Sequence, residues 1–338
     1  MKQRTFASDG PSLGAVGLGC MGMSWGYAES GREDSQSADV IAKALDAGVN
    51  MIDTADIYGD GHNETVVGRG IEGRRDRTFL ATKCGLVVDD LPQKRMHRDG
   101  TPAHVKAAVR ESLQRLKVDS VDLIYLHRID DNVPLAETWG AMAELVNDGL
   151  VQHLGLSEVS VAQAAEAHTL HPVSAIQSEL SLWTRDALGQ SHPTDGTDNA
   201  AAGEKISASG DVVGWCATNG ATFVPFAPLG RGFLTGSITT AAFESNDFRA
   251  TNPRFSGGAL TQNLRIVDVV KKVAARHEAS AAQVAIAWTL AQGHHVVPIP
   301  GTRNQRHLGD NVGAAELTLT SEDLSLLSTV PATVGARY

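Results

Sequence analysis

The sequence predicts an α/β fold in which eight parallel strands alternate with helices and close into a (β/α)8 TIM barrel. Two observations carry this prediction: short apolar runs alternate with helical segments along the chain, and there are eight such runs. The length of 338 residues agrees, because one barrel domain uses a chain of about this size. We therefore expect residues 1–338 to form a single domain.

The predicted strands are continuous apolar runs rather than alternating ones, as is typical of parallel strands that are buried on both faces. An open doubly wound sheet is the alternative. The G-x-G-x-x-G motif expected at its first strand-to-helix turn is missing, and GLGCMG is too loose a match. In chain order the runs are GAVGLGCM (14–21), NMIDTAD (50–56), TFLATKC (78–84), VDLIYLH (121–127), HLGLSE (153–158), SAIQSEL (174–180), TFVPFAP (222–228) and HVVPIPG (295–301).

Helical periodicity fills the intervals between these runs. In SADVIAKALDAG, residues Ala38, Ile41, Ala42 and Leu45 recur at i, i+3, i+4 and i+7, and Gly48 supplies a stop. This pattern predicts a helix between the first two strands, with that stripe facing the core.

Capping signals mark two further helices. Thr101 and Pro102 suit the N-cap and first position of one, and Ser280 with Gln283 has capping-box spacing at the start of another. Apolar stripes support one helix after Pro102 and a second further along: Val105, Val109, Leu113 and Leu116, then Leu135, Trp139, Met142 and Val146.

One stretch interrupts the alternation. Residues 187–210, ALGQSHPTDGTDNAAAGEKISASG, have almost no large apolar side chains. We interpret them as a flexible surface insertion, with a substrate lid as the alternative.

Composition excludes several classes of function. The net charge of −10 argues against a general nucleic-acid or anionic-membrane surface, and no apolar stretch reaches membrane-spanning length. Cys20, Cys84 and Cys216 are far apart and form no CxxC pair, which is typical of a reducing cytoplasm. We expect a cytoplasmic protein without a metal site. The sequence has no signature that indicates an oligomeric state.

Ionisable residues stand where successive strands end, which is where a barrel of this type carries its active site. They are Asp53 with Tyr58 just beyond it, Lys83 and His127. Each alone has an ordinary explanation, since Lys83 could open a solvated loop and His127 could be a structural histidine. Four such groups at successive strand ends indicate a catalytic site.

The four residues make chemical sense together. A tyrosine with a pKa near 10 is a poor acid or base at neutral pH, and a lysine beside it lowers that pKa. A buried Lys83 needs an anion, which Asp53 can supply. His127 can donate to a substrate carbonyl oxygen and orient it. The set predicts a proton donor aimed at a carbonyl group.

The chain resembles the aldo-keto reductases at this point. IDTADIYG, LATKCG and LIYLHR match the segments that carry that family's Asp, Tyr, Lys and His tetrad, and later segments match its cofactor site. The bacterial and plant members with LGLGCMGMS and PLGRGFLTG segments are the most similar. The later segments, in chain order, are GLSEVS, IQSELSLWTRD, PFAPLGRGFLTG and PIPGTRNQ.

The resemblance implies an NADP(H)-dependent reductase of small-molecule carbonyl compounds. Tyr58 would be the general acid and base, Lys83 and Asp53 would tune it, and His127 would orient the carbonyl. Trp25 and Tyr27 could line the substrate pocket. The residues that would border or bind the cofactor are Gly19, Cys20, Met21, Ser157, Glu158, Gln177, Phe226, Pro228, Leu229, Gly230, Gly232, Gly301, Thr302, Arg303, His307, Asp310 and Asn311.

Within that set the resemblance implies distinct roles. Ser157 and Gln177 would bind the carboxamide, Phe226 would stack on the nicotinamide, and the segment from Gly301 to Arg303 would hold the 2′-phosphate. The chain departs from the family where Glu158 replaces a frequent Asn, because a carboxylate accepts hydrogen bonds but cannot donate them.

Two other functions stay open from the sequence. Some proteins of this fold act as redox-sensing partners of channels, and the intact tetrad weighs against that reading. A class I aldolase would use Lys83 as a Schiff base, although the neighbouring Asp53 argues for a charged lysine. Turnover of NADPH and borohydride trapping would separate these alternatives.

Overall fold

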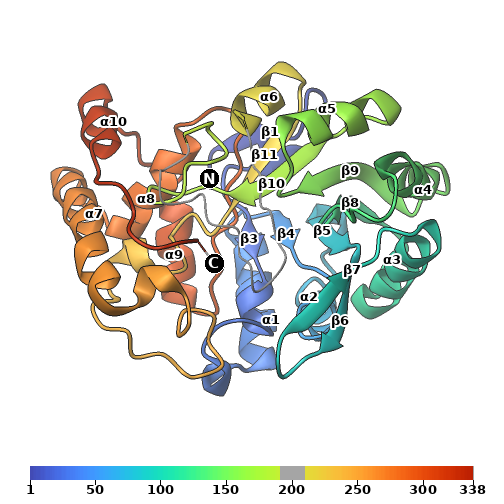
Figure 1. The fold of residues 1–338 in the computed structure, drawn as a ribbon, viewed down its shortest axis with the longest axis horizontal. Coiled ribbons are helices and arrows are strands. Elements are labelled where there is room, and N and C mark those ends of the chain that lie inside the picture. The colour runs from blue at the N-terminus through green and yellow to red at the C-terminus, as the bar shows by residue number, and fades with distance from the viewer. Residues whose placement is uncertain (191–209, 338) are drawn as a thin grey trace.

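The computed structural model describes residues 1–190 and 210–337. Seven parallel strands form one sheet in the order β11-β10-β9-β8-β5-β4-β3, and helices surround it (Figure 1). The α/β class and the (β/α)8 barrel are therefore confirmed. The strands are β3 (Leu18–Gly19), β4 (Met51–Asp53), β5 (Phe79–Cys84), β8 (Val121–Leu126), β9 (Val151–Ser157), β10 (Ala175–Glu179) and β11 (Thr222–Phe226).

The eighth predicted run closes the barrel without forming a regular strand. Val297 and Ile299 donate backbone hydrogen bonds to β11, and Gly17 donates to Pro298 on the other side. Isolated parallel bridges join Phe223 to Val296 and Gly19 to Gly301. Pro298 and Pro300 have no N–H to offer β3, so a continuous ladder cannot form on that side.

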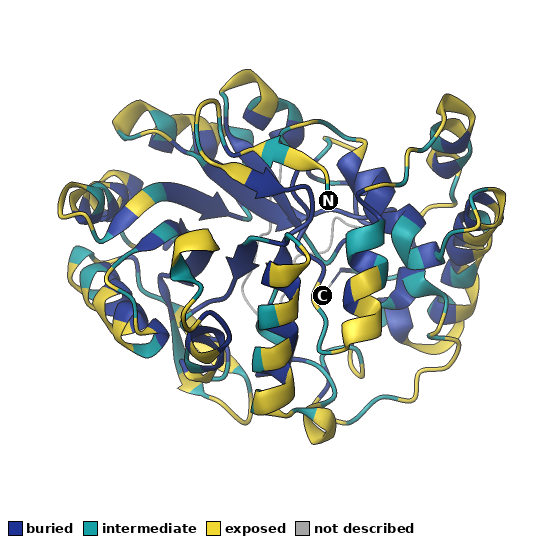
Figure 2. Ribbon diagram, turned by 180° about the vertical axis from the view of Figure 1, so that it is seen from behind, coloured by how far each residue is buried: buried dark blue, intermediate teal, exposed yellow. Residues whose placement is uncertain are grey.

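Ten α-helices lie among the described residues, and Figure 2 shows that their outward faces are exposed while the strands of the seven-stranded sheet are mostly buried. None of these helices combines the length and the apolar character needed to cross a membrane. Their bounds are α1 (Asp34–Asp46), α2 (His62–Gly70), α3 (Pro102–Leu116), α4 (Leu135–Asn147), α5 (Val161–Leu170), α6 (Val212–Thr218), α7 (Gly257–Arg276), α8 (Ala281–Leu290), α9 (Gln305–Gly313) and α10 (Ser321–Ser328). Short 3-10 turns are η1 (Met21–Met23), η2 (Glu29–Gly31), η3 (Arg75–Arg77), η4 (Phe233–Thr235) and η5 (Pro253–Phe255).

The capping signals were reliable. The Thr101 hydroxyl accepts from the His104 N–H with Pro102 in the first position of α3, and Ser280 and Gln283 form a reciprocal capping box on α8. The stripe predicted for α1 was partly wrong. Ile41 and Leu45 are buried, but the face turns toward Ser37, Val40 and Ala44, which leaves Ala38 and Ala42 at its border.

Two hairpins were not predicted. Strands β1 (Gln3–Thr5) and β2 (Ser12–Gly14) pair antiparallel, as do β6 (Leu86–Asp90) and β7 (Arg95–Arg98). The first hairpin carries Phe6 and Leu13 into the cluster that fills the barrel interior, where both side chains are fully buried. The ring of Phe6 lies 4.6 Å from Phe79 and 5.0 Å from His153 between centroids. The hairpin thus closes the end of the barrel at which the strands begin.

The predicted insertion at 187–210 lies mostly outside the described residues, which exclude 191–209. Its first residues belong to the fold, because Ala187 is buried in the core and Leu188 packs against it. Leu188 also forms an antiparallel bridge with Asp211. The start of the insertion was therefore placed too early.

We predict that Phe6→Ala lowers the free energy of unfolding by about 3–5 kcal/mol, because it empties a fully enclosed aromatic site. Urea unfolding followed by circular dichroism measures this change. Leu170→Ala is the control, since Leu170 is 51% exposed and its loss should change stability by less than about 0.5 kcal/mol. Equal stability of the two variants would contradict the role of the hairpin.

Candidate active site

The four predicted catalytic residues meet at the end of the barrel where the strands finish. Lys83 is their centre. Its Nζ donates to Asp53 Oδ1 at 2.6 Å and to Tyr58 Oη at 3.2 Å. A third bond of 2.7 Å goes to the carbonyl oxygen of Thr54. The rings of Tyr58 and His127 lie edge to face with centroids 6.0 Å apart.

The strand register explains why these residues meet. Asp53 pairs with Ala81 in β5, so Lys83 extends two residues beyond it toward the barrel mouth. His127 follows the last residue of β8 and donates its N–H to the Cys84 carbonyl at 2.8 Å. Parallel neighbours end at the same edge of a sheet, which brings the three side chains together.

Asn63, which was not predicted from the sequence, holds the loop that carries Tyr58. It is fully buried in α2, and its N–H donates to the Tyr58 carbonyl at 3.0 Å. Its side-chain oxygen accepts from Thr54 at 2.7 Å, and its amide donates to the Cys20 carbonyl and Ser24 Oγ at 2.9 Å each. No local periodicity could reveal this role, because it joins three separate segments.

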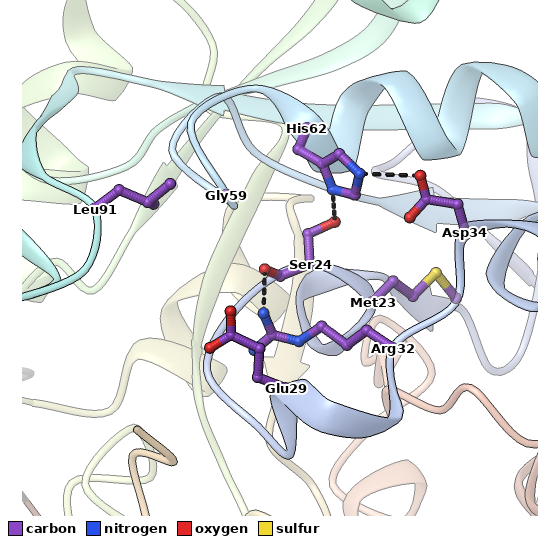
Figure 3. A pocket seen from close by; sticks show the side chains of 8 residues that line it. All are labelled: Met23, Ser24, Glu29, Arg32, Asp34, Gly59, His62 and Leu91. Atoms are coloured by element: carbon purple, nitrogen blue, oxygen red, sulfur yellow. Dashed lines mark hydrogen bonds and ion pairs between the residues drawn. The ribbon is translucent and has the colours of Figure 1, made fainter. Parts of the chain in front are cut away.

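The loop between η1 and α1 is tied down by a second polar network (Figure 3). His62 Nδ1 lies 2.8 Å from Ser24 Oγ, and its Nε2 lies 3.0 Å from Asp34 Oδ2. Arg32 donates to the Ser24 carbonyl at 2.8 Å. Because Asn63 also binds Ser24 Oγ, this network joins the loop to the helix that supports Tyr58.

Burial and neighbouring charges shift the pKa values of the tetrad in different directions. Burial raises the pKa of Tyr58 above its ordinary value, and Lys83 opposes that rise by stabilising the phenolate. The sequence predicted only the lowering effect, which is present but smaller than the effect of burial. Burial alone would lower the pKa of Lys83, but Asp53 and Tyr58 raise it, so the lysine is charged.

His127 is a neutral imidazole at physiological pH. Burial lowers its pKa well below the ordinary value, and the charges of Arg128 and Lys83 lower it further. A neutral imidazole keeps one N–H that can donate to an oxygen in the cleft.

A cleft of about 1720 Å³ opens above the tetrad. Cys20 and Gly230 are buried, the side chain of Glu158 is buried, and none of the three forms part of the cleft wall as the described residues define it. Lys83 also lies behind the wall, covered by Tyr58. The predicted residues that line it are Gly19, Met21, Trp25, Tyr27, Asp53, Tyr58, His127, Ser157, Gln177, Phe226, Pro228, Leu229, Gly232, Gly301, Thr302, Arg303, His307, Asp310 and Asn311.

Of the two residues predicted to bind a carboxamide, Gln177 is hydrogen-bonded to the tetrad. Gln177 Nε2 donates to Asp53 Oδ2 at 2.8 Å, so one carboxylate joins the amide to Lys83. Ser157 Oγ accepts from Arg128 at 3.2 Å. Glu158 is different, because its Oε1 accepts from the backbone N–H of Glu179 at 2.8 Å and its side chain is buried.

The segment from Gly301 to Arg303 leads into α9 at the far side of the cleft. Asn304 caps this helix by accepting from the N–H groups of Arg306 and His307. Arg303 donates from both terminal nitrogens to the Ala28 carbonyl at 3.2 Å, and it is half-buried. A guanidinium has five donors, so this anchor leaves others for an anion.

Trp25 and Tyr27 line the cleft from the loop after η1. Trp25 is nearly buried and packs in one cluster with Ile57 and Tyr58. Tyr27 lies edge to face with Phe248 at 6.3 Å between ring centroids. The wall beside Tyr58 is therefore apolar, with Trp25, Ile57 and Leu86 in one cluster.

The chain is similar to known proteins along most of its length. The sequence model of the Aldo/keto reductase family matches residues 15–330. A soybean (Glycine max) protein, "Probable aldo-keto reductase 1", is 35% identical over 337 residues, which covers 98% of this chain and 90% of the soybean protein.

Solved structures show the same fold. The glycerol dehydrogenase AKR11B4 from Gluconobacter oxydans is 27% identical with a TM-score of 0.82, over 97% of this chain and 94% of that one. An aldo-keto reductase from Klebsiella pneumoniae, solved in complex with NADPH, is 24% identical with a TM-score of 0.72, over 99% and 97% of the two chains.

Proposed function

The chain belongs to the aldo/keto reductase family, and we propose that it is an NADPH-dependent reductase of aldehydes or ketones. The observation that carries the proposal is the bonding of Lys83 to both Asp53 and Tyr58 beneath an open cleft. This arrangement prepares a tyrosine to exchange a proton with an oxygen in the cleft. The reaction is reversible, since the same tyrosine accepts the proton during alcohol oxidation.

The cleft has the groups that a nicotinamide dinucleotide needs. Phe226 offers a ring face for stacking, and Ser157 with Gln177 offers a hydroxyl and an amide to the carboxamide. Arg303 and the N-terminus of α9 offer positive charge to a phosphate at the other side. The NADPH complex of the Klebsiella pneumoniae neighbour supports this choice of cofactor.

The bound nicotinamide supplies a hydride to the carbonyl carbon. This chain's residues supply the proton and the orientation. Tyr58 protonates the carbonyl oxygen, and the charged Lys83 stabilises the phenolate that remains. Neutral His127 donates a hydrogen bond that directs the same oxygen toward Tyr58. The apolar wall formed with Trp25 would exclude water from the reacting carbonyl.

The aldolase alternative is disfavoured by the same geometry. A Schiff-base lysine must be neutral to attack a carbonyl, whereas Lys83 is held by Asp53, Tyr58 and a carbonyl oxygen and has a raised pKa. A regulatory subunit would need no proton donor in the cleft. Steady consumption of NADPH with a panel of aldehydes and ketones distinguishes an enzyme from that alternative.

We predict that Tyr58→Phe lowers kcat for ketone reduction by about 10²–10⁴-fold, because it removes only the proton that must reach the substrate oxygen. The dissociation constant for NADPH should change little, since the ring remains in place. Both quantities follow from NADPH fluorescence, by turnover and by titration. Reduction at the wild-type rate would show that Tyr58 is not the proton donor.

We predict that Lys83→Met moves the pH dependence of alcohol oxidation to higher pH. Oxidation needs the phenolate, and without the lysine charge the pKa of Tyr58 rises further. Asp53→Asn should act in the same direction through Lys83, so the two losses of kcat should not add in the double variant. Additive losses would show that Asp53 does not act through Lys83. An unchanged pH profile in Lys83→Met would show that Lys83 does not tune the pKa of Tyr58.

We predict that Arg303→Ala lowers the preference for NADPH over NADH by about 10–100-fold, the value of a charged hydrogen bond to phosphate. Arg303 also anchors the loop that carries Ala28, and loss of that anchor would affect the binding of both cofactors. The ratio of the kcat/KM values for NADPH and NADH isolates the contribution of the phosphate. Arg265→Ala is the control, because Arg265 is exposed and lies outside the cleft wall. An unchanged ratio in Arg303→Ala would place the 2′-phosphate elsewhere.

A further inference from the structure

A second buried charge cluster lies behind the cleft, beside the end that would hold the nicotinamide. It contains the carboxylates of Glu158 and Glu179, whose side chains are each only 1% exposed. Arg337 lies between them. Its Nη2 is 2.8 Å from Glu158 Oε2, and its Nε donates to Glu179 Oε2 at 2.8 Å. One guanidinium therefore joins two buried carboxylates.

The two carboxylates differ in their dependence on Arg337. Glu179 also faces Arg231 at 3.4 Å and accepts from Thr184 at 2.9 Å. Burial alone would raise its pKa, but Arg337, Arg231 and Arg254 lower it to about 2. Among the described residues, Arg337 is the one cation in contact with Glu158. Arg337 therefore compensates the Glu158 carboxylate alone, whereas Arg231 also compensates the Glu179 carboxylate.

Glu158 occupies a constrained position between two cofactor-site strands. It follows Ser157 at the end of β9, and its backbone is left-handed with φ +54°, which is unfavourable for a residue with a side chain. Its N–H donates to the Gln177 carbonyl at 2.9 Å, and its carboxylate accepts from the Glu179 N–H. These contacts fix the direction in which Ser157 faces the cleft.

The segment after α10 brings Arg337 to this place. Asn252 donates to the Arg337 carbonyl at 2.8 Å, and Asn263 exchanges two hydrogen bonds with Val334 at 2.9 and 2.8 Å. The guanidinium then lies 5.8 Å from the ring centroid of Phe226, within the range of a cation–π contact. Arg337 thus contacts Glu158, which directly follows Ser157, and the ring of Phe226 itself.

We propose that Arg337 is a positioning residue for the nicotinamide end of the cofactor site. It neutralises the buried Glu158 carboxylate and holds Ser157 and Phe226 in the arrangement that receives the carboxamide and the ring. The inference rests on the proposed function, since it assumes that the cleft binds a nicotinamide dinucleotide. It assigns Arg337 no contact with the reacting atoms.

The test compares the binding of NADPH with that of 2′,5′-ADP, which lacks the nicotinamide half. Arg337→Met should weaken NADPH binding about tenfold or more at about pH 8, because a buried carboxylate has lost its cation. Binding of 2′,5′-ADP should not change. Fluorescence titration and calorimetry give the two dissociation constants.

Rescue distinguishes positioning from general support of the fold. Adding Glu158→Gln to Arg337→Met removes the uncompensated charge, so NADPH binding should return to within about threefold of the wild type. Arg276→Met is the control, because Arg276 also pairs with a buried carboxylate, Asp323, but far from the cleft. Circular dichroism and urea unfolding establish that each variant is folded.

Two outcomes would overturn the inference: NADPH binding unchanged in Arg337→Met, or NADPH and 2′,5′-ADP weakened equally without rescue by Glu158→Gln. If Arg337→Met does not fold, Arg337→Lys carries the test. Lysine keeps the charge but lacks the planar guanidinium that spans Glu158 and Glu179 here, so NADPH should bind about threefold more weakly and recover with Glu158→Gln. Unchanged NADPH binding in Arg337→Lys would also overturn the inference. Failure of the wild type to bind NADPH would instead refute the proposed function.

Discussion

The site is organised by the need to keep one ammonium group charged inside the protein. Lys83 is fully buried, and a buried cation without compensation is costly. Asp53, Tyr58 and the Thr54 carbonyl meet that need. All three belong to β4 and the loop that follows it. The position of Lys83 in β5 therefore constrains the path of the chain from Asp53 to Tyr58.

The same carboxylate extends this constraint across the barrel. Asp53 uses its second oxygen to accept from Gln177, which stands opposite in β10. A change in the charge of Lys83 would therefore act on a side chain predicted to hold the cofactor, and binding there would act on Lys83 in return. In the proposed reaction, charge balance at this one strand end would couple proton transfer to cofactor recognition.

Features that repeat along the chain could be predicted from the sequence. The strand runs, the cap at Thr101 and the ionisable residues at strand ends each depend on local pattern, and the structure brings Asp53, Lys83 and the other tetrad residues together. Features that depend on distant contacts were missed. The first hairpin is stabilised by the burial of Phe6 inside the barrel, which a local sequence pattern does not reveal. Asn63 and Arg337 contact segments that are remote from them in sequence. The prediction of a regular eighth strand was wrong, because Pro298 and Pro300 have no N–H to donate to a backbone ladder.

The proline-containing eighth segment also makes the backbone hydrogen bonding uneven around the barrel. The contact between β3 and residues 295–301 has fewer backbone donors than the strand pairs on the other sides. Gly19 and Gly301 approach so closely there that a Cβ on either would lie within 3 Å of a backbone oxygen. Local opening begins where hydrogen bonds are fewest, so amide exchange is expected to be fastest along this line. Gly19 also pairs with Asp53 in β4, so this line of sparse hydrogen bonding lies one strand away from the carboxylate that holds Lys83.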